Sequence, residues 1–450
     1  MKLRARSLAG RQRGVTTLII VALLFFVLSL VAAYTNRNLI FEQRTSANQY
    51  RSTQALEAAE AGVEWALSML NAGRIGDPAV AVAADDSCDS TIDTSKTSFR
   101  ERYLTISGTT GVVQAAPTVA ADGLSGTVWP SCVFDGTNWD CSCPSTGSPV
   151  LVQPGSAGVH SAFRVRFVRH TPDRTGLVWL EVNGCTRLDN ACLDFPAQAV
   201  SGDSRATVRV LIALKSGLPA TPSAALTVRG VLDAEDAALG AYNPSTGGSS
   251  LAVLTSSTRL NAGNMRLGGA PGAPADAALL VVDDDLPLAM VSTPGLSPEA
   301  KSLRMFSNTM LADMATYRDQ PASIVLDCGT VTCDADLIRS TAARNPGRIL
   351  WARGGDVNLG AGADIGSATD PVMLVVDGAL NLDATLHGAI YGMPTDWSVT
   401  GAGTVRGAMI AGNNMAGGAT LTVVRDAPVL ALLRLRTGSF VRVPGGWRDF

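Results

Sequence analysis

The feature that most constrains this chain is an uninterrupted apolar stretch near its N-terminus. Residues Gly14 to Ala33 read GVTTLIIVALLFFVLSLVAA and contain no charged side chain. As a helix, residues 15–33 would span about 28 Å, close to the roughly 30 Å hydrocarbon core of a bilayer. The preceding leader, residues 1–14, holds five basic and no acidic side chains. This asymmetry predicts a transmembrane helix whose leader stays in the cytoplasm while the remainder is exported.

Two simpler kinds of segment share these properties. A cleaved secretory signal has an apolar core of about 7–15 residues followed by a small-residue cleavage site, whereas this run is longer and no clear break follows Ala33. A plain membrane anchor remains an alternative, but here the helical pattern continues beyond the membrane. Apolar residues spaced three and four apart indicate one buried helical face: Leu56, Ala59, Val63, Ala66 and Leu70. We therefore predict one long helix over residues 15–71.

Composition limits the function of the exported part. The 450 residues are 46% hydrophobic and 17% charged, which suits a folded chain of two or three domains. Without the five positive charges of the leader, the net charge changes from −3 to −8. A mildly acidic protein gives no support for nucleic-acid binding.

All eight cysteines follow the apolar helix and so lie on the exported side, where an even number favours disulfides. The close pairs Cys185 with Cys192 and Cys328 with Cys333 are candidate disulfides. Four more cysteines would form two further bonds whose pairing the sequence leaves open: Cys88, Cys132, Cys141 and Cys143. Because Cys141-Ser-Cys143 lacks the usual spacing of zinc ligands, we expect no metal site there.

Residues 72–220 are predicted to form a small antiparallel β domain that bears disulfides. Its first part has little pattern, but 162–168, 176–182 and 206–213 read as three strands with one buried face. The basic residues of these strands and the turn after the first are expected to form the solvated face: Arg164, Arg166, Arg169 and Arg209.

Residues 225–427 are rich in glycine and alternate short apolar strands with turns. Asp356-Val-Asn-Leu359 is matched by Ala379-Leu-Asn-Leu382, 23 residues later. A recurring unit of about 20 residues predicts a β-solenoid, with a β-sandwich as the alternative. Residues 294–345 read as a helical insertion, and 428–450 as a C-terminal strand and tail. The expected class is α+β: a long N-terminal helix, the antiparallel domain and the solenoid-like domain.

No catalytic constellation is evident. The histidines, His160, His170 and His387, occupy no metal-ligand spacing and no nucleophile motif. The run Asp283–Asp285 could ligate calcium, although a solvated turn is favoured. Four aspartates are expected at rung corners: Asp356, Asp364, Asp377 and Asp383. They leave a membrane-anchored β-helix enzyme that degrades polysaccharide as a further alternative. We expect no catalytic residue, cofactor or metal.

Three segments together resemble a known family. Arg11-Gln-Arg-Gly14, the apolar run Val15–Ala33 and the helix ending Ala55-Leu-Glu-Ala-Ala-Glu-Ala-Gly62 are similar to PilX-type minor pilins of type IV pili, the counterparts of the K-type pseudopilins of type II secretion. The resemblance covers about residues 8–70, with a more general likeness over 225–427.

The resemblance implies that a prepilin peptidase cuts between Gly14 and Val15. The subunit would first sit in the inner membrane, as a single-pass protein with a periplasmic C-terminal domain. It would then help prime pilus assembly with other minor pilins and the major pilin, and sit in the fibre or at its tip on the cell surface. An alternative is a tip adhesin for a surface ligand.

One position departs from the family pattern. Major pilins carry a glutamate five residues after the cut, where its carboxylate neutralises the buried amine of a neighbouring subunit. This chain has Ile19 there. We interpret the missing glutamate as consistent with a subunit that stands first in line, at the tip.

Overall fold

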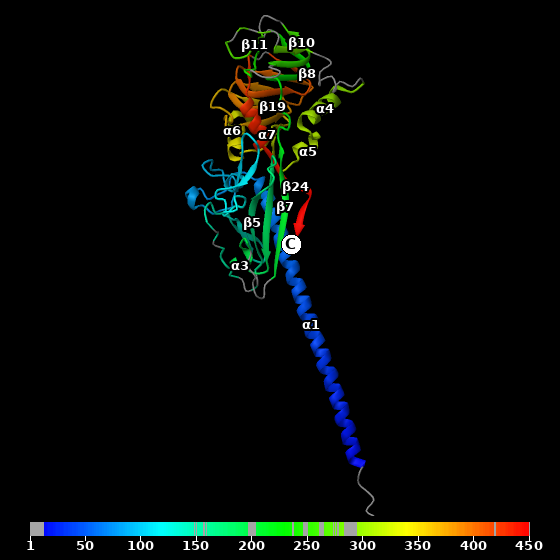
Figure 1. Cartoon of the computed structure of the whole chain (residues 1–450). Helices are drawn as coiled ribbons and strands as arrows, with labels where there is room; N and C mark the ends of the chain where they lie inside the picture. The colour runs from blue at the N-terminus through cyan, green and yellow to red at the C-terminus, as the bar shows by residue number, and fades with distance from the viewer. Residues whose placement is uncertain are drawn as a thin grey trace, which may run out of the picture.

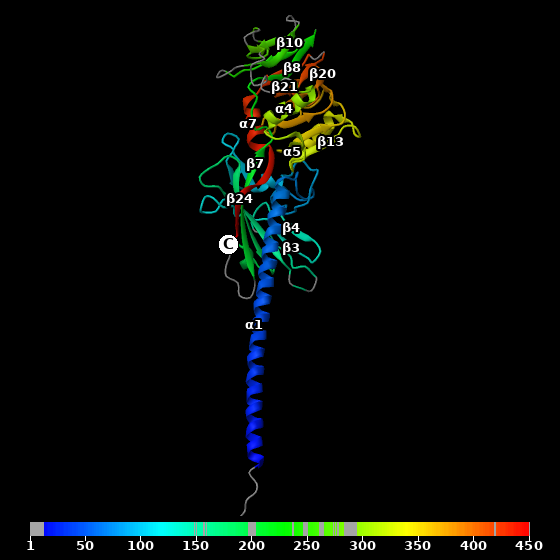
Figure 2. The ribbon, with the colours of Figure 1, turned by 90° about the vertical axis from the view of Figure 1, so that its right-hand side faces the viewer.

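The computed structural model describes residues 13–147, 149, 151–155, 158, 160–196, 204–235, 238–245, 251–260, 265–272, 274, 276, 279–282, 295–417 and 420–449. Three parts follow one another along the long axis of the molecule (Figure 1). A long helix projects from a lobe built around an antiparallel sheet, which we call the sheet lobe. A second lobe of mostly parallel strands, the solenoid lobe, lies at the far end from the free part of the helix, and the perpendicular view agrees (Figure 2).

Helix α1, Arg13–Leu70, is 58 residues long and confirms the prediction of a continuous helix. Among the described residues, it is the one helix long and apolar enough to span a membrane. Its upper part packs on the sheet lobe. The predicted stripe is buried there, with Ala59, Val63 and Leu70 fully covered and Leu56 half-buried.

The sheet lobe contains a six-stranded sheet in the order β24-β7-β6-β5-β3-β4. These strands are β3 Ser131–Phe134, β4 Trp139–Ser142, β5 Ala162–Arg169, β6 Leu177–Cys185, β7 Arg205–Ser216 and β24 Gly438–Asp449. Smaller elements surround the sheet: η1 Val82–Ala84, α2 Phe99–Tyr103, β1 Leu104–Ile106, β2 Val113–Ala115 and α3 Asn190–Leu193. The predicted meander is confirmed, because β5, β6 and β7 pair antiparallel in sequence order.

Helix α1 lies unusually close to one face of this sheet. Val165, Leu180 and Val208 of that face share a core with the buried stripe of α1. A methyl group on Gly184 of β6 would collide with the backbone of Ala55 and Ala59, and one on Gly62 would lie 2.7 Å from a methyl of Val182. Two glycines therefore set the distance between helix and sheet.

The solenoid lobe is a large, nearly closed stack of parallel strands, as predicted. In two runs of its main path each strand pairs with the next but one, for example β17 with β19 and β19 with β21, and β8 joins the two runs by pairing with β21 and β22. Its strands are β8 Leu226–Glu235, β9 Gly240–Tyr242, β10 Val253–Leu260, β11 Arg266–Gly268, β12 Leu280–Val282, β13 Ser323–Asp327, β14 Cys333–Asp334, β15 Ile349–Arg353, β16 Val357–Leu359, β17 Val372–Val376, β18 Leu380–Leu382, β19 Thr385–Gly392, β20 Asp396–Thr400, β21 Thr404–Ala411, β22 Asn414–Ala416 and β23 Thr422–Arg425. Aliphatic side chains from successive rungs fill its interior.

The segment expected to be a helical insertion is only partly helical. It contains α4 Pro298–Met310, α5 Met314–Arg318 and α6 Ala335–Arg344. However, β13 and β14 of the same segment pair in parallel with β15 and β16. This part of the segment is therefore the first rung of the solenoid itself.

The prediction of a strand from Pro428 was wrong. Residues Ala427–Arg436 form helix α7, with proline in its first turn and Asp426 accepting a hydrogen bond from the amide of Val429. Val429, Leu430 and Leu433 are buried on one helical face. The chain then returns to the sheet lobe, where β24 pairs antiparallel with β7 as the edge strand (Figure 1).

Four disulfides link the cysteines. Both candidate pairs are joined in the structure, Cys185 with Cys192 and Cys328 with Cys333. The four cysteines whose pairing the sequence left open bond as Cys88–Cys143 and Cys132–Cys141.

Adding a methyl group at Gly184 tests the close contact of helix and sheet. We expect Gly184→Ala to lower the free energy of unfolding by about 1–3 kcal/mol, because α1 must move off the sheet. Gly155→Ala is the control, since a methyl group there meets no atom within 4 Å. Thermal unfolding of the detergent-solubilised chain measures both variants, and equal melting temperatures would contradict the contact.

Candidate functional site: the projecting helix and the lobe junction

The lower part of α1 is the first candidate site, because its apolar side chains are covered by no other element of the described chain. Large hydrophobic residues from Val15 to Val31 are 51–71% exposed. Gly14, Val15 and Ile19 lie at the free end of the helix, far from both lobes (Figure 1). An apolar surface of this length needs lipid or neighbouring helices around it.

The end of α1 is the second candidate site, because both lobes meet there. The Asn71 amide donates to the carbonyls of Leu67 and Phe440, both at 2.9 Å, and accepts from the amide of Phe440 at 2.8 Å. This side chain therefore closes the last turn of the helix and fixes it to the edge strand β24.

Arg100 joins the helix end to both lobes. Its guanidinium donates to the carbonyls of Leu70 (3.1 Å) in α1, Gly438 (2.8 Å) in β24, Arg436 (3.2 Å) in α7 and Gly347 (3.3 Å) in the solenoid lobe. Only 6% of the residue is exposed. Burial lowers the pKa of Arg100 to about 10, so it stays charged at neutral pH.

Other hydrogen bonds cross the same junction. The Nε of Arg74 donates to the carbonyl of Ala343 at 2.7 Å, and the hydroxyl of Tyr317 donates to the carbonyl of Gly217. The amide of Ala322 donates to the hydroxyl of Ser439 at 3.0 Å. The solenoid lobe is thus fastened to the sheet lobe by several independent contacts.

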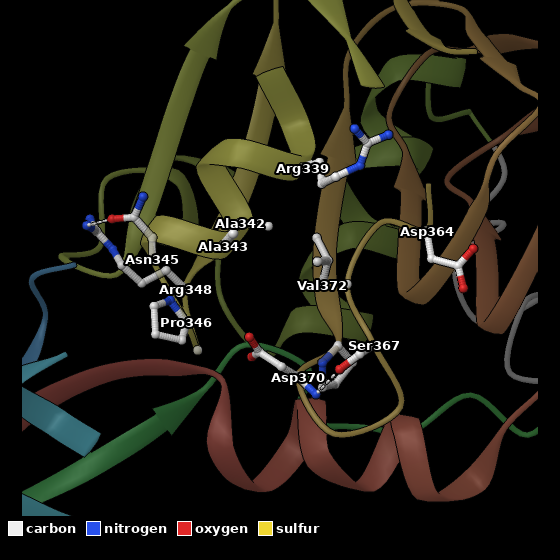
Figure 3. Close-up of a pocket in the computed structure, with 13 residues that line it drawn as sticks. Arg339, Ala342, Ala343, Asn345, Pro346, Arg348, Asp364, Ser367, Asp370 and Val372 are labelled. Atoms are coloured by element: carbon white, nitrogen blue, oxygen red, sulfur yellow. Dashed lines mark hydrogen bonds between the residues drawn. The ribbon is translucent and has the colours of Figure 1, made fainter. Parts of the chain in front are cut away.

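A cleft of two chambers, about 210 Å³ and 410 Å³, lies beside the junction. Both chambers are lined by Pro346, Gly347, Asp370 and Pro371. Figure 3 shows the smaller chamber, with Arg348 beside Asn345 on one wall and Asp370 on a facing loop. Asp370 keeps solvent contact, yet the walls displace enough water to raise the pKa of its carboxyl group.

Each of the four rung-corner aspartates contacts a backbone amide or a side chain of the solenoid lobe. Asp356 accepts from the amide of Ala379, and Asp383 from the amide of Ala402, both at 2.9 Å. Asp377 accepts from the indole of Trp351 at 3.3 Å, and Asp364 contacts His387 at 3.2 Å. The first two carboxylates therefore fasten one rung to the next, as a structural role requires.

No cluster of three or more metal-binding side chains occurs in the part of the chain that the structure describes. Asp283–Asp285, the possible calcium ligands, lie outside the described residues. A buried ion pair, Lys96 with Asp85 at 3.0 Å, occupies the loops of the sheet lobe. Burial alone would raise the pKa of Asp85, but the hydrogen bond from Lys96 and backbone amides lower it below the ordinary value.

The expected solvated face of basic residues needs a correction. Arg164 is 1% exposed and donates to Ser131 at 2.9 Å and to Asp194. Arg209 lies over the ring of Trp179, 4.6 Å from its centre. The partners of Arg164 come from other segments of the chain, so local alternation could not reveal them.

Sequence reasoning missed Asn71 and Arg100. The signal available for Asn71 was its place directly after the buried stripe, where a helix needs partners for its last carbonyls. Arg100 follows Ser98, whose capping box with Glu101 marks a short helix, but neither residue indicates which carbonyls the guanidinium reaches.

Comparison with known proteins agrees with the geometry of α1. Residues 13–64 match the family model described as PilX N-terminal, which confirms the predicted resemblance for the long helix. No curated protein matches the chain. Among solved structures, the competence-associated pilin ComZ from Thermus thermophilus is 10% identical, with 89% of this chain and 97% of that chain covered and a TM-score of 0.20. At that TM-score the likeness carries no weight for the fold.

Replacing Arg100 tests the junction. Arg100→Met leaves buried carbonyl groups without a donor, and we expect it to lower the free energy of unfolding by about 3 kcal/mol. The exposed Arg434 of α7 offers a matched control as Arg434→Met. Thermal unfolding and proteinase K cleavage of the connecting segments at 217–225 and 426–437 report the effect. Cleavage at the rate of the unmodified chain would show that Arg100 does not hold the lobes together.

Proposed function

We propose that this chain, which carries the PilX N-terminal segment, is a non-enzymatic minor pilin that joins a type IV pilus through α1. The observation that supports this most strongly is the free part of the helix. Its family match covers residues 13–64, and its large side chains from Val15 to Val31 are exposed although they are apolar. Such a helix can lie in a bilayer before assembly and pack against other pilin helices afterwards.

In this proposal a prepilin peptidase removes the leader. The bond between Gly14 and Val15 lies at the free end of α1, and no other segment of the described chain lies within 4 Å of the position that a Cβ of Gly14 would occupy. The leader is basic, so it stays on the cytoplasmic side of the inner membrane and the two lobes are periplasmic. The mature subunit would begin at Val15 and keep its whole apolar helix.

The subunit is proposed to prime assembly and to stand at the tip. Ile19 supplies no carboxylate to neutralise the buried amine of a subunit placed ahead of it. An unpaired charge in a low-dielectric helix bundle is costly. The first subunit in the fibre has no neighbour ahead, so it is the one position where this absence costs nothing.

Adhesion is the second candidate function, and it is compatible with the first. The solenoid lobe lies farthest from the free end of α1, where a fibre would present it (Figure 1). The chamber of about 410 Å³ at the lobe junction offers room for a ligand. A polysaccharide-degrading enzyme is less favoured, because two of the four corner aspartates accept amide hydrogens of the following turn.

A glutamate at position 19 tests the tip position. We expect Ile19→Glu to spread the protein along the fibre, because the new carboxylate can neutralise the amine of a subunit ahead. Ile20→Glu is the matched control, since it adds the same charge one residue away on an equally exposed side chain. Immunogold labelling of sheared fibres measures the distribution. A pattern confined to fibre ends in both variants would contradict the proposed role of position 19.

Excision of residues 223–424 separates priming from adhesion. The Nε of Arg425 donates to the carbonyl of Pro222 at 3.0 Å, so a short Gly-Ser link can close the chain and β24 is retained. Leu430→Gln and Leu433→Gln accompany the excision, because both side chains pack on the solenoid lobe. Fibres that form but no longer attach to surfaces would support adhesion by this lobe. A loss of fibres would assign the lobe to assembly.

A further inference from the structure

The outer face of the sheet lobe, turned away from α1, carries a row of charges across four strands. In the register of the sheet, Arg166 lies opposite Glu181, Glu181 opposite Arg209, and Arg209 opposite Arg448. We call these four residues the basic row. It contains three guanidinium groups and one carboxylate, so two positive charges are left over.

The excess charge is concentrated at one end of the row. Glu181 accepts two hydrogen bonds from Arg166, at 3.1 Å and 3.0 Å. Arg209 and Arg448 both lie over the indole of Trp179, 4.6 Å and 5.3 Å from its centre. The buried Nε of Arg209 has no hydrogen-bond partner among the described residues. Two neighbouring cations on one aromatic ring repel each other, and an anionic partner would relieve the repulsion.

The opposite side of the same lobe carries a matching set of anions. Glu57, Glu60 and Glu64 lie three and four residues apart on α1, and all three are exposed. They occupy the face of the helix opposite the stripe that is buried against the sheet. We call these three residues the acidic stripe. Glu64 also pairs with Arg442 of β24. Glu57 and Glu60 are therefore the two members that are exposed to solvent without an ion pair among the described residues.

The basic row and the acidic stripe cannot meet within one chain, because the sheet and the helix lie between them. We propose that the basic row of one copy binds the acidic stripe of a second copy. Arginine suits this contact, since its planar fork donates two parallel hydrogen bonds to a carboxylate. The contact rests on the proposed function in one respect, namely that α1 anchors both copies side by side in the same membrane before assembly.

The two surfaces differ, so the contact is heterologous. A self-complementary dimer would use one patch twice, whereas a row that binds a stripe leaves one free surface at each end. Copies anchored side by side in the membrane, before one of them takes the tip position, could therefore add head to tail. The charges set the register between neighbours more than the strength of the contact.

Photo-crosslinking of full-length copies in cells tests this contact. One copy carries p-benzoylphenylalanine at position 61, next to Glu57 and Glu60 on the helix surface, and the second carries an epitope tag. We expect a crosslink that maps to β7 or β24 near Arg209 and Arg448. Arg448→Glu in the tagged copy should lower its yield by about tenfold, because a repulsion replaces an attraction.

Charge exchange makes the test specific. Arg448→Glu in the tagged copy together with Glu57→Arg and Glu60→Arg in the other should restore the crosslink. Arg174→Glu, an equal change at an exposed turn of the same lobe, should leave it unaltered. The proposal is overturned if Arg448→Glu leaves the crosslink yield unchanged, or if the crosslink maps elsewhere. A second result would also overturn it: the chain is retained on polygalacturonate, Arg448→Glu abolishes this retention, and no crosslink between copies forms.

The experiment is run in cells without prepilin peptidase, where the leader stays attached. Its outcome then does not depend on pilus formation. Fibre incorporation is measured separately, in cells that have the peptidase. A crosslink in the first cells and no incorporation in the second would retain this inference while removing the proposed function, and incorporation without the crosslink would do the reverse.

Discussion

The guanidinium of Arg100 is the contact that joins helix α1 and both lobes at a single point. A buried cation is tolerated only when acceptors surround it, and the acceptors here come from α1, β24, α7 and the solenoid lobe. Each of these segments thus supplies a hydrogen-bond acceptor to the same buried charge. Together with Asn71, this arrangement fixes the last turn of α1 to both lobes.

Helix α1 has two different environments along its length. Near Ala59 it packs so tightly that Gly184 has no room for a side chain, whereas its large apolar side chains from Val15 to Val31 are exposed. The same helix therefore anchors a folded protein at one end and requires lipid or other helices at the other. In the proposed function, Ile19 leaves this helix without the carboxylate that a major pilin offers to a neighbouring subunit.

Local pattern predicted the long helix, the meander β5–β7 and the solenoid, since each depends on periodicity within a short window. It did not predict where distant segments meet. The apolar residues after Pro428 suit a strand or a helix until their packing is known, and nothing near β24 indicates that it pairs with β7. Arg164 alternates like a solvated residue, yet Asp194, 30 residues later, covers it. The junction at Arg100 was missed for the same reason.

The first residue of the mature protein tests the central claim most directly, because a pilin keeps its apolar helix and a secreted protein loses it. N-terminal sequencing of the chain from sheared fibres and from membranes gives the answer. The account predicts a start at Val15 in both fractions, and a start at Met1 in cells without prepilin peptidase. A start near Thr35, after the apolar helix, would contradict it.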